Sequence, residues 1–257
     1  MTGTRRTGLV LQDRDRRLLD ELVIMRVIDR EQAKLVAGFG STTRANTRLL
    51  ALTRAGILRR FFTGTIVGGF KAIYSLSAKG AAIAGVALDQ RFPRLDSAVV
   101  GERFLEHRMR VNAVYLAVKF HPIPQARFRR WVSFRAPLSK SVPLIPDGYF
   151  EVMTATETLS MFLEVDLGTE PQKRWQRKLE AYLQLAISGD FERLLGQPKF
   201  RVLVLANSSR RLSRIRSTVA RRTDKIFRFG TFDIVRPENF WTPVWLRPQG
   251  ETRVSLL

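Results

Sequence analysis

Two segments of strand length, residues 144–152 and 158–166, restrict the fold more than any other part of the sequence. A short polar turn over residues 154–157 joins them, so they are predicted to pair as an antiparallel hairpin. A turn centred on that stretch places Asp147 directly opposite Glu164. Because side chains alternate between the two faces of a strand, both acids are predicted on one face, with apolar core residues on the other.

The acids of this hairpin form a candidate metal site. Asp166 follows Glu164 by two residues and therefore shares the face of Glu164 and Asp147. Carboxylates at opposite or diagonal positions of a hairpin repel each other unless a cation lies between them. Clustered oxygen ligands suit Mg²⁺, which keeps several waters and binds substrate phosphates. The pattern, which also places Glu151 on this face, therefore predicts a divalent ion such as Mg²⁺ beside these acids.

Helices and strands alternate around the hairpin. A long helix over residues 97–120 is apolar on two sides, which is typical of a buried central helix. A strand precedes the hairpin, and a helix, a strand, a helix and two strands follow it. This order predicts an α/β domain with a mixed sheet. The other elements are predicted at residues 127–134, 172–187, 200–206, 208–222, 226–235 and 243–246.

The first third of the chain has a different pattern. Apolar residues recur at helical spacing in three segments, and two β-rich segments joined by glycines follow them. Three helices with a short turn before the third, followed by a hairpin, match a winged helix-turn-helix. The helices are predicted at residues 13–28, 30–37 and 41–55, and the hairpin strands at 57–63 and 70–76.

A polar connector that contains a proline separates the two patterns near Arg91. We therefore expect two domains, a winged helix-turn-helix DNA-binding domain over residues 1–90 and an α/β domain over residues 91–257. The second domain is then α/β. The chain as a whole, which joins this domain to the winged helix-turn-helix, is α+β.

The charge of the chain indicates a polyanionic partner. There are 44 Lys and Arg against 23 Asp and Glu, which gives a formal net charge of +21. Such an excess favours double-stranded DNA as the partner, with an anionic membrane surface second. The absence of cysteine excludes disulfides, thiol catalysis and cysteine-based metal sites. We find no segment typical of a membrane span or a signal peptide, and expect a cytoplasmic protein without membrane contact.

The candidate DNA contacts follow from this geometry. In a winged helix-turn-helix the third helix presents its N-terminal residues to base edges in the major groove, and the wing meets phosphates. Helix 208–222 has arginines opposite its apolar stripe, which suits a phosphate backbone better than a bilayer. The alternative for the first domain is a module that contacts only protein. The candidate contacts are Thr42, Thr43, Arg44, Thr47, Arg48, Arg59, Arg60, Lys71, Arg210, Arg214 and Arg221.

Pro146-Asp147 on one strand and Glu164-Val165-Asp166 on the next resemble the PD-(D/E)xK nuclease superfamily, whose restriction-endonuclease-like core has the same α-β-β-β-α-β order. Together with the winged helix and the long helix that follows it, they also resemble the plasmid replication-relaxation family. The resemblance implies metal-assisted hydrolysis of DNA phosphodiesters, with Asp147, Glu164 and Asp166 as catalytic residues. It also implies that Asp147 and Glu164, with Asp166 as a further candidate, are the ligands of Mg²⁺.

The sequence departs from the superfamily at one position. Where the superfamily has a lysine two residues after the glutamate, this sequence has Asp166. Some relatives carry the lysine on the next helix, and Lys178 lies on that predicted helix, one turn before Tyr182. The resemblance therefore implies that Lys178 is the catalytic residue that orients the water or stabilises developing charge.

Two functions stay open. Either the protein nicks or cleaves DNA with Mg²⁺ in the replication or transfer of a plasmid or mobile element, or it is a catalytically inactive DNA-binding accessory factor or transcriptional regulator. In the second case the acids serve solubility or pair with neighbouring arginines. Replication or transfer proteins are the candidate protein partners.

Overall fold

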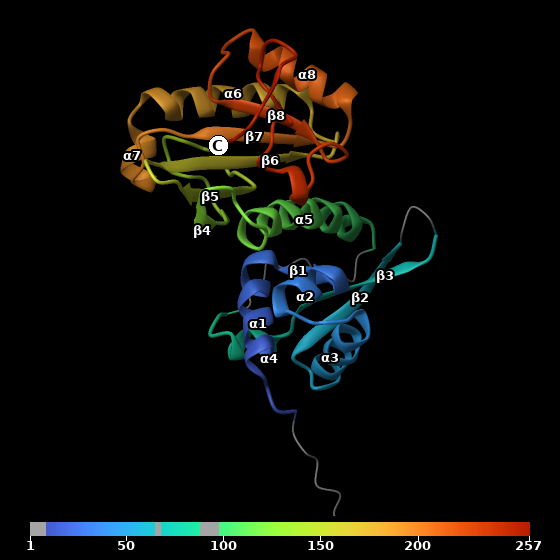
Figure 1. The fold of residues 1–257 in the computed structure, drawn as a ribbon. Coiled ribbons are helices and arrows are strands. Elements are labelled where there is room, and N and C mark those ends of the chain that lie inside the picture. The colour runs from blue at the N-terminus through green and yellow to red at the C-terminus, as the bar shows by residue number, and fades with distance from the viewer. Residues whose placement is uncertain (1–8, 65–67, 88–97) are drawn as a thin grey trace, which may run out of the picture. The chain divides into compact units, whose positions relative to one another are not determined.

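The chain divides into two compact units, Met1–Asn112 and Ala113–Leu257. The division falls within helix α5 (Ala98–Lys119). The domain boundary predicted near Arg91 lies outside the described residues. The predicted fold class, α/β with an α+β chain overall, is confirmed by the helices and the mixed sheet. The computed structural model describes residues 9–64, 68–87 and 98–257 (Figure 1).

The described part of the first unit has four helices before α5 and a three-stranded antiparallel sheet in the order β1-β3-β2. Asp29 caps α2 by accepting a hydrogen bond from the Gln32 amide, and Ser41 caps α3 in the same way through the Arg44 amide. Gly38, with a φ of 66°, ends α2. The elements are α1 (Asp13–Met25), β1 (Val27–Asp29), α2 (Arg30–Ala37), α3 (Thr42–Arg54), β2 (Leu58–Gly64), β3 (Phe70–Leu76) and the short α4 (Ala78–Ile83).

The prediction of a first helix that runs to residue 28 is wrong at its end. Helix α1 stops at Met25, because Arg26 has a φ of 65°, outside the helical region. Val27 and Ile28 are β-branched and form β1, in which Ile28 pairs with Tyr74 of β3. The hairpin therefore becomes a three-stranded sheet with β3 in the centre, buried in its second half.

The first half of α5 belongs to the first unit. The Asn112 side-chain amide donates a hydrogen bond of 2.7 Å to the Val27 carbonyl, and the Arg108 guanidinium donates one of 3.0 Å to the Ile24 carbonyl. Leu105 is buried in one cluster with Val27 and a β3 residue. These contacts anchor this half of the helix against β1.

The second unit is a seven-stranded mixed sheet in the order β10-β9-β8-β7-β6-β5-β4. The strands from β4 to β6 are antiparallel, β6, β7 and β8 are parallel, and β8 to β10 are antiparallel again. Helix α7 is an addition to the predicted elements. The elements are β4 (Arg127–Val132), β5 (Gly148–Met153), β6 (Thr158–Asp166), α6 (Gln172–Ile187), α7 (Asp190–Leu195), β7 (Arg201–Ala206), α8 (Ser209–Ala220), β8 (Phe227–Thr231), a 3₁₀ turn (Pro237–Asn239), β9 (Trp245–Leu246) and β10 (Arg253–Val254).

The hairpin of β5 and β6 has the predicted register. Gly148 pairs with Leu163, and the turn closes with a hydrogen bond of 2.9 Å from the Thr154 amide to the Glu157 carbonyl. Continuing the register by one residue places Asp147 opposite Glu164. The Asp147 amide extends the ladder with a hydrogen bond of 3.1 Å to the Leu163 carbonyl.

Both faces of this sheet are core. Tyr149 and Phe162 share the face of the acids and are buried in one cluster with residues of α6 and α8, which cover that face (Figure 1). On the other face, Tyr115 of α5 contacts Trp131, which stacks on Phe150. The acids therefore lie in a layer between sheet and helices, where an unpaired charge is costly.

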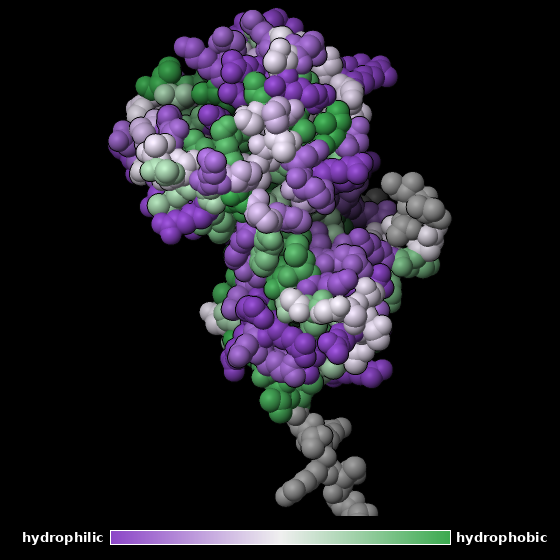
Figure 2. All heavy atoms as spheres, viewed as in Figure 1, coloured by the Kyte–Doolittle hydropathy of each residue, from purple (hydrophilic) through white to green (hydrophobic). Residues whose placement is uncertain are grey.

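No helix in the described ranges combines the length and the apolar character that crossing a membrane requires. In the view of Figure 2, hydrophilic residues dominate the visible surface around α8. That distribution suits a helix whose outer face meets a polar or charged partner.

Candidate active site and nucleic-acid interface

Glu164 is the centre of a buried polar cluster. It lies on β6 and is fully buried. The Tyr182 hydroxyl donates a hydrogen bond of 2.6 Å to Oε1, and the Lys178 ammonium donates one of 2.8 Å to Oε2. Lys178 and Tyr182 reach the same carboxylate because they stand one turn apart on α6. Lys178 also pairs with Glu170 at 2.9 Å.

Burial and neighbouring charges set the protonation of this cluster. Burial raises the pKa of Glu164 to about 7; the ammonium of Lys178 opposes this rise and the charge of Asp147 adds to it. Burial disfavours the charge of Lys178, but the carboxylates of Glu164, Asp147 and Glu170 raise its pKa above the ordinary value. Burial and the charge of Glu164 also raise the pKa of Tyr182. Lys178 is therefore cationic and Tyr182 a neutral donor at neutral pH.

Asp147 stands at the start of the hairpin, just before β5, and is half-buried. Its Oδ2 accepts a hydrogen bond of 2.7 Å from the Val165 amide, which fixes the carboxylate beside β6. The charge of Asp147 acts on Glu164, Lys178 and Tyr182 alike. The structure thus brings Asp147, Glu164 and Lys178 together.

Asp166 belongs to a separate network on the same face of β6. The Arg211 guanidinium binds its carboxylate through Nε at 2.8 Å and a terminal nitrogen at 2.7 Å. The Trp175 indole donates to Oδ2 at 2.5 Å, and the Gly168 amide donates to Oδ1 at 2.6 Å. Burial alone would raise the pKa of Asp166, but the bonds from Arg211 and Trp175 outweigh it and lower that pKa. Both oxygens of Asp166 are engaged by protein donors.

Within the described ranges, no three Asp, Glu or His side chains are grouped so that they could hold a metal ion. The acids of the cluster instead meet protein cations. Lys178 lies between Glu164 and Glu170, and Arg211 neutralises Asp166.

The N-terminal half of α3 is open to solvent, as a recognition helix requires. Thr43, Arg44 and Thr47 are exposed and Thr42 is half-buried. Arg48 differs from them. Its guanidinium binds the fully buried carboxylate of Asp15 and donates a hydrogen bond of 2.7 Å to the Val10 carbonyl.

We expect Arg48→Ala to lower the free energy of unfolding by about 2 kcal/mol, because it leaves the Asp15 carboxylate buried without its cation. Asp15 keeps the hydrogen bond from the Gln12 amide, which limits the loss. Thr47→Ala, one residue earlier and exposed, is the matched control and should change stability by less than about 0.5 kcal/mol. Urea denaturation measures both variants. Equal stabilities would contradict a structural role for Arg48.

The basic residues of the wing differ in their surroundings. Arg59 and Arg60 are exposed on β2, and the Arg60 guanidinium lies 5.2 Å from the centre of the Phe62 ring. Lys71 on β3 forms an ion pair with Asp29 at the start of α2. Arg59 and Arg60 are adjacent along the strand and therefore point to opposite faces of the wing.

Helix α8 presents its arginines as predicted from its amphipathic pattern. Arg210, Arg214 and Arg221 are exposed, while Leu212 and Ile215 are buried. Sequence reasoning did not select Arg211, which bonds to Asp166 across 45 residues of sequence. The signal available in the sequence was its place in the first turn of a helix that follows a parallel strand, where anions bind.

The chain matches one family model and is similar in part to solved structures. The model of the replication-relaxation family matches residues 14–197. A solved structure of the restriction endonuclease FokI bound to DNA is 11% identical, with a TM-score of 0.28, and the match covers 88% of this chain and 45% of that chain. A second structure of FokI is 13% identical, with a TM-score of 0.31, and covers 84% and 42%. The chain thus spans less than half of either FokI chain, and no curated protein matches it.

Proposed function

Since this chain belongs to the replication-relaxation family, we propose that it is a double-stranded-DNA-binding protein of plasmid or mobile-element replication that cuts a DNA strand with Mg²⁺ at Asp147, Glu164 and Lys178. The observation that carries the proposal is the hairpin register. It sets two carboxylates opposite each other, and a lysine from α6 binds one of them.

DNA binding is supported by charge and exposure. The formal net charge is +21, and exposed basic side chains lie on α3, on the wing and on α8. The order α2, turn, α3, hairpin is that of a winged helix-turn-helix, in which α3 would enter the major groove. Exposed threonines and an arginine at the start of α3 suit hydrogen bonding to base edges.

Base-reading and phosphate-binding residues should respond differently to mutation. We expect Arg44→Ala to reduce the preference for the cognate sequence by about tenfold. Arg59→Ala on the wing should weaken binding to all sequences alike and lower the slope of log affinity against log salt by about 1. Fluorescence anisotropy with a cognate and a scrambled duplex at several salt concentrations measures both effects. Equal losses on both duplexes for the two variants would contradict the assignment.

Two carboxylates of the cluster, those of Asp147 and Glu164, suit a divalent ion. Mg²⁺ is commonly held by one or two carboxylates together with waters and substrate phosphates, so a cage of three protein ligands is not required. Asp147 lies opposite Glu164 when the register of the hairpin is continued by one residue, so two carboxylates stand together at this position. Asp147 and Glu164 would hold the ion, whereas Asp166 is engaged by Arg211 and would position that arginine.

In this proposal the bound ion would polarise the scissile phosphate and lower the pKa of a water. The chain's own residues prepare the site. Tyr182 and Lys178 fix the orientation of Glu164 through one hydrogen bond to each oxygen. Lys178 stays protonated and would stabilise the negative charge that develops on the phosphate oxygens. The Val165 amide holds Asp147 in place.

Supercoiled plasmid incubated with the protein and Mg²⁺ tests the proposal. We expect conversion to the open-circular or linear form by the wild-type protein, and none with EDTA or with the Asp147→Ala/Glu164→Ala double variant. A gel shift without divalent ions checks that the double variant still binds DNA. A loss of cutting can then be distinguished from a loss of DNA binding.

A second function is favoured by the occupied oxygens of Glu164. Because Tyr182 and Lys178 already bind both of them, the cluster is also a complete structural ion pair. A protein that shifts DNA in a gel but cuts with neither Mg²⁺ nor Mn²⁺ would be a non-cutting accessory factor or transcriptional regulator.

A further inference from the structure

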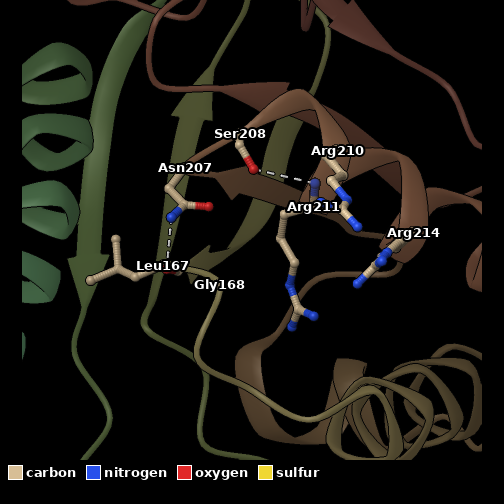
Figure 3. Close-up of a pocket in the computed structure, with 7 residues that line it drawn as sticks. All are labelled: Leu167, Gly168, Asn207, Ser208, Arg210, Arg211 and Arg214. Atoms are coloured by element: carbon tan, nitrogen blue, oxygen red, sulfur yellow. Dashed lines mark hydrogen bonds between the residues drawn. The ribbon is translucent and has the colours of Figure 1, made fainter.

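A cavity of about 390 Å³ opens where the parallel strands β6 and β7 end and α8 begins. Three parts of the chain line it: the turn after β6 at Gly168, the residue that follows β7, Asn207, and the first turns of α8 (Figure 3). The polar side chains at the start of α8 that line it are Ser208, Arg210, Arg211 and Arg214.

The walls of this cavity are fixed by hydrogen bonds. The Asn207 side-chain amide donates a bond of 2.7 Å to the Leu167 carbonyl. Gly168 has a φ of 84°, and a Cβ there would lie only 3.3 Å from the Asn207 side chain. Ser208 caps α8 by accepting a bond of 3.3 Å from the Arg211 amide. The cavity is therefore bounded by backbone held in one conformation, which suits a defined small group.

Its charges are unbalanced. Arg211 is neutralised by Asp166. Arg210 and Arg214 are exposed, stand one turn apart on α8, and make no side-chain ion pair or hydrogen bond with any described residue. Glu170, whose backbone carbonyl accepts a hydrogen bond from Arg211, has its carboxylate paired with Lys178 and Arg174. Three guanidinium groups against one carboxylate leave an excess of about two positive charges.

We propose that this cavity binds a phosphate monoester, the dianionic group at the end of a phosphorylated DNA strand or on a free mononucleotide. A monoester carries about −1.5 to −2 charges at neutral pH, which balances the excess, whereas a backbone phosphodiester carries only one. Arginine forks pair with phosphate oxygens, and the Ser208 hydroxyl and the start of α8 add donors and a favourable dipole.

The position of the cavity connects it with the hairpin site. Asp166, which holds Arg211, is two residues from Glu164 and on the same face of β6. A strand end held by Arg210 and Arg214 would therefore lie on the same side of the sheet as the proposed cutting site. This strand-end form of the inference rests on the proposed function, but the phosphate binding itself does not.

The test compares a short single-stranded oligonucleotide that carries a 5′-phosphate with the same oligonucleotide that carries a 5′-hydroxyl. Both have a dye at the 3′ end, and their binding to the full-length protein is measured by anisotropy in EDTA. We expect the 5′-phosphate to bind about tenfold more tightly, because charged hydrogen bonds contribute on that scale. Because the two oligonucleotides differ only at the 5′ end, a difference between their affinities reports on the terminal phosphate.

The Arg210→Ala/Arg214→Ala double variant should bring the ratio to about one. Arg222→Ala, which removes an exposed arginine just beyond α8, is the matched control and should keep the preference. Inorganic phosphate and AMP are the competitors. If they remove the preference at low millimolar concentration, the cavity takes free phosphate monoesters; if only 5′-phosphorylated DNA competes, it takes strand ends.

A wild-type protein that binds both oligonucleotides equally would overturn the inference, and so would a preference that survives the double variant. Since no divalent ion is present and no strand is cut, a failure of the nicking assay leaves this result unaffected. Conversely, if the protein cuts plasmid but shows no preference for the 5′-phosphate, only the proposal of a phosphate-binding cavity is contradicted.

Discussion

Replacing Lys178 by methionine is expected to lower the free energy of unfolding by about 3 kcal/mol at pH 8. The substitution keeps most of the apolar length of the side chain but removes the ammonium that binds Glu164 at 2.8 Å. The carboxylate of Glu164 then stays fully buried. Of the side-chain donors that the structure describes for it, Tyr182 remains. Urea denaturation of the two proteins measures the loss. Lys173→Met, on the same helix and exposed, is the matched control and should cost less than about 0.5 kcal/mol.

The stability lost in Lys178→Met should depend on pH, and the raised pKa of Glu164 fixes the direction of that dependence. Its pKa is raised from 4.5 to about 7 in the folded protein. Between these values the folded state binds a proton that the unfolded state does not, so the stability that this proton gives is present at low pH and is lost as pH rises through 7. Without Lys178 the pKa of Glu164 rises further. The deficit of Lys178→Met should therefore be smaller at pH 5 than at pH 8.

A double variant separates charge from packing. Glu164→Gln/Lys178→Met removes both partners, and we expect it to recover a large part of the stability lost in Lys178→Met at pH 8. If the deficit of the single variant is the same at pH 5 and pH 8, and the double variant recovers nothing, the ion pair is not what stabilises this part of the protein.

The hairpin that carries the site could be predicted because its geometry is local. Alternation of side chains has a period of two, and a short turn leaves one register that keeps the apolar residues of 144–152 and 158–166 in the core. Asp147 opposite Glu164 follows from the turn alone. The spacing of Lys178 and Tyr182 on one helical turn is equally local, and both reach Glu164.

Partners across long stretches of sequence could not be predicted in the same way. Arg48 resembles its neighbours on α3, yet a buried carboxylate 33 residues away holds it. Asp166 alternates in step with Glu164, yet Arg211 and Trp175 bind it from two different helices. Periodicity fixes the face to which a side chain points, but the group that meets it there depends on how helices lie on the sheet.

The end of α1 shows a second reason why part of the fold could not be predicted from the sequence. Apolar residues at helical spacing continue past Met25, and nothing in the pattern marks the positive φ of Arg26. The strand forms because β3 offers Val27 and Ile28 a pairing partner about 45 residues later. Tertiary pairing thus overrides local helical preference where β-branched residues are available.

Under the proposed function, Asp147→Asn is expected to reduce Mg²⁺-dependent nicking of supercoiled plasmid by at least about a hundredfold, the scale on which a lost electrostatic contact to a transition state acts. The amide is isosteric and its oxygen can still accept the bond from the Val165 amide, so the fold should be unchanged. Asp224→Asn, at an exposed position beyond α8, is the matched control and should nick like the wild type. Initial rates of open-circle formation measure the effect.

Asp166→Asn should behave in the opposite way. It weakens the bidentate pair with Arg211, and we expect a loss of about 2 kcal/mol in the free energy of unfolding, with nicking retained by the protein that stays folded. Full activity in Asp147→Asn, or abolished nicking in a stably folded Asp166→Asn, would contradict this division of roles. Asp147 would then not be a ligand, or Asp166 would take part in cutting, directly or through the arginine that it holds.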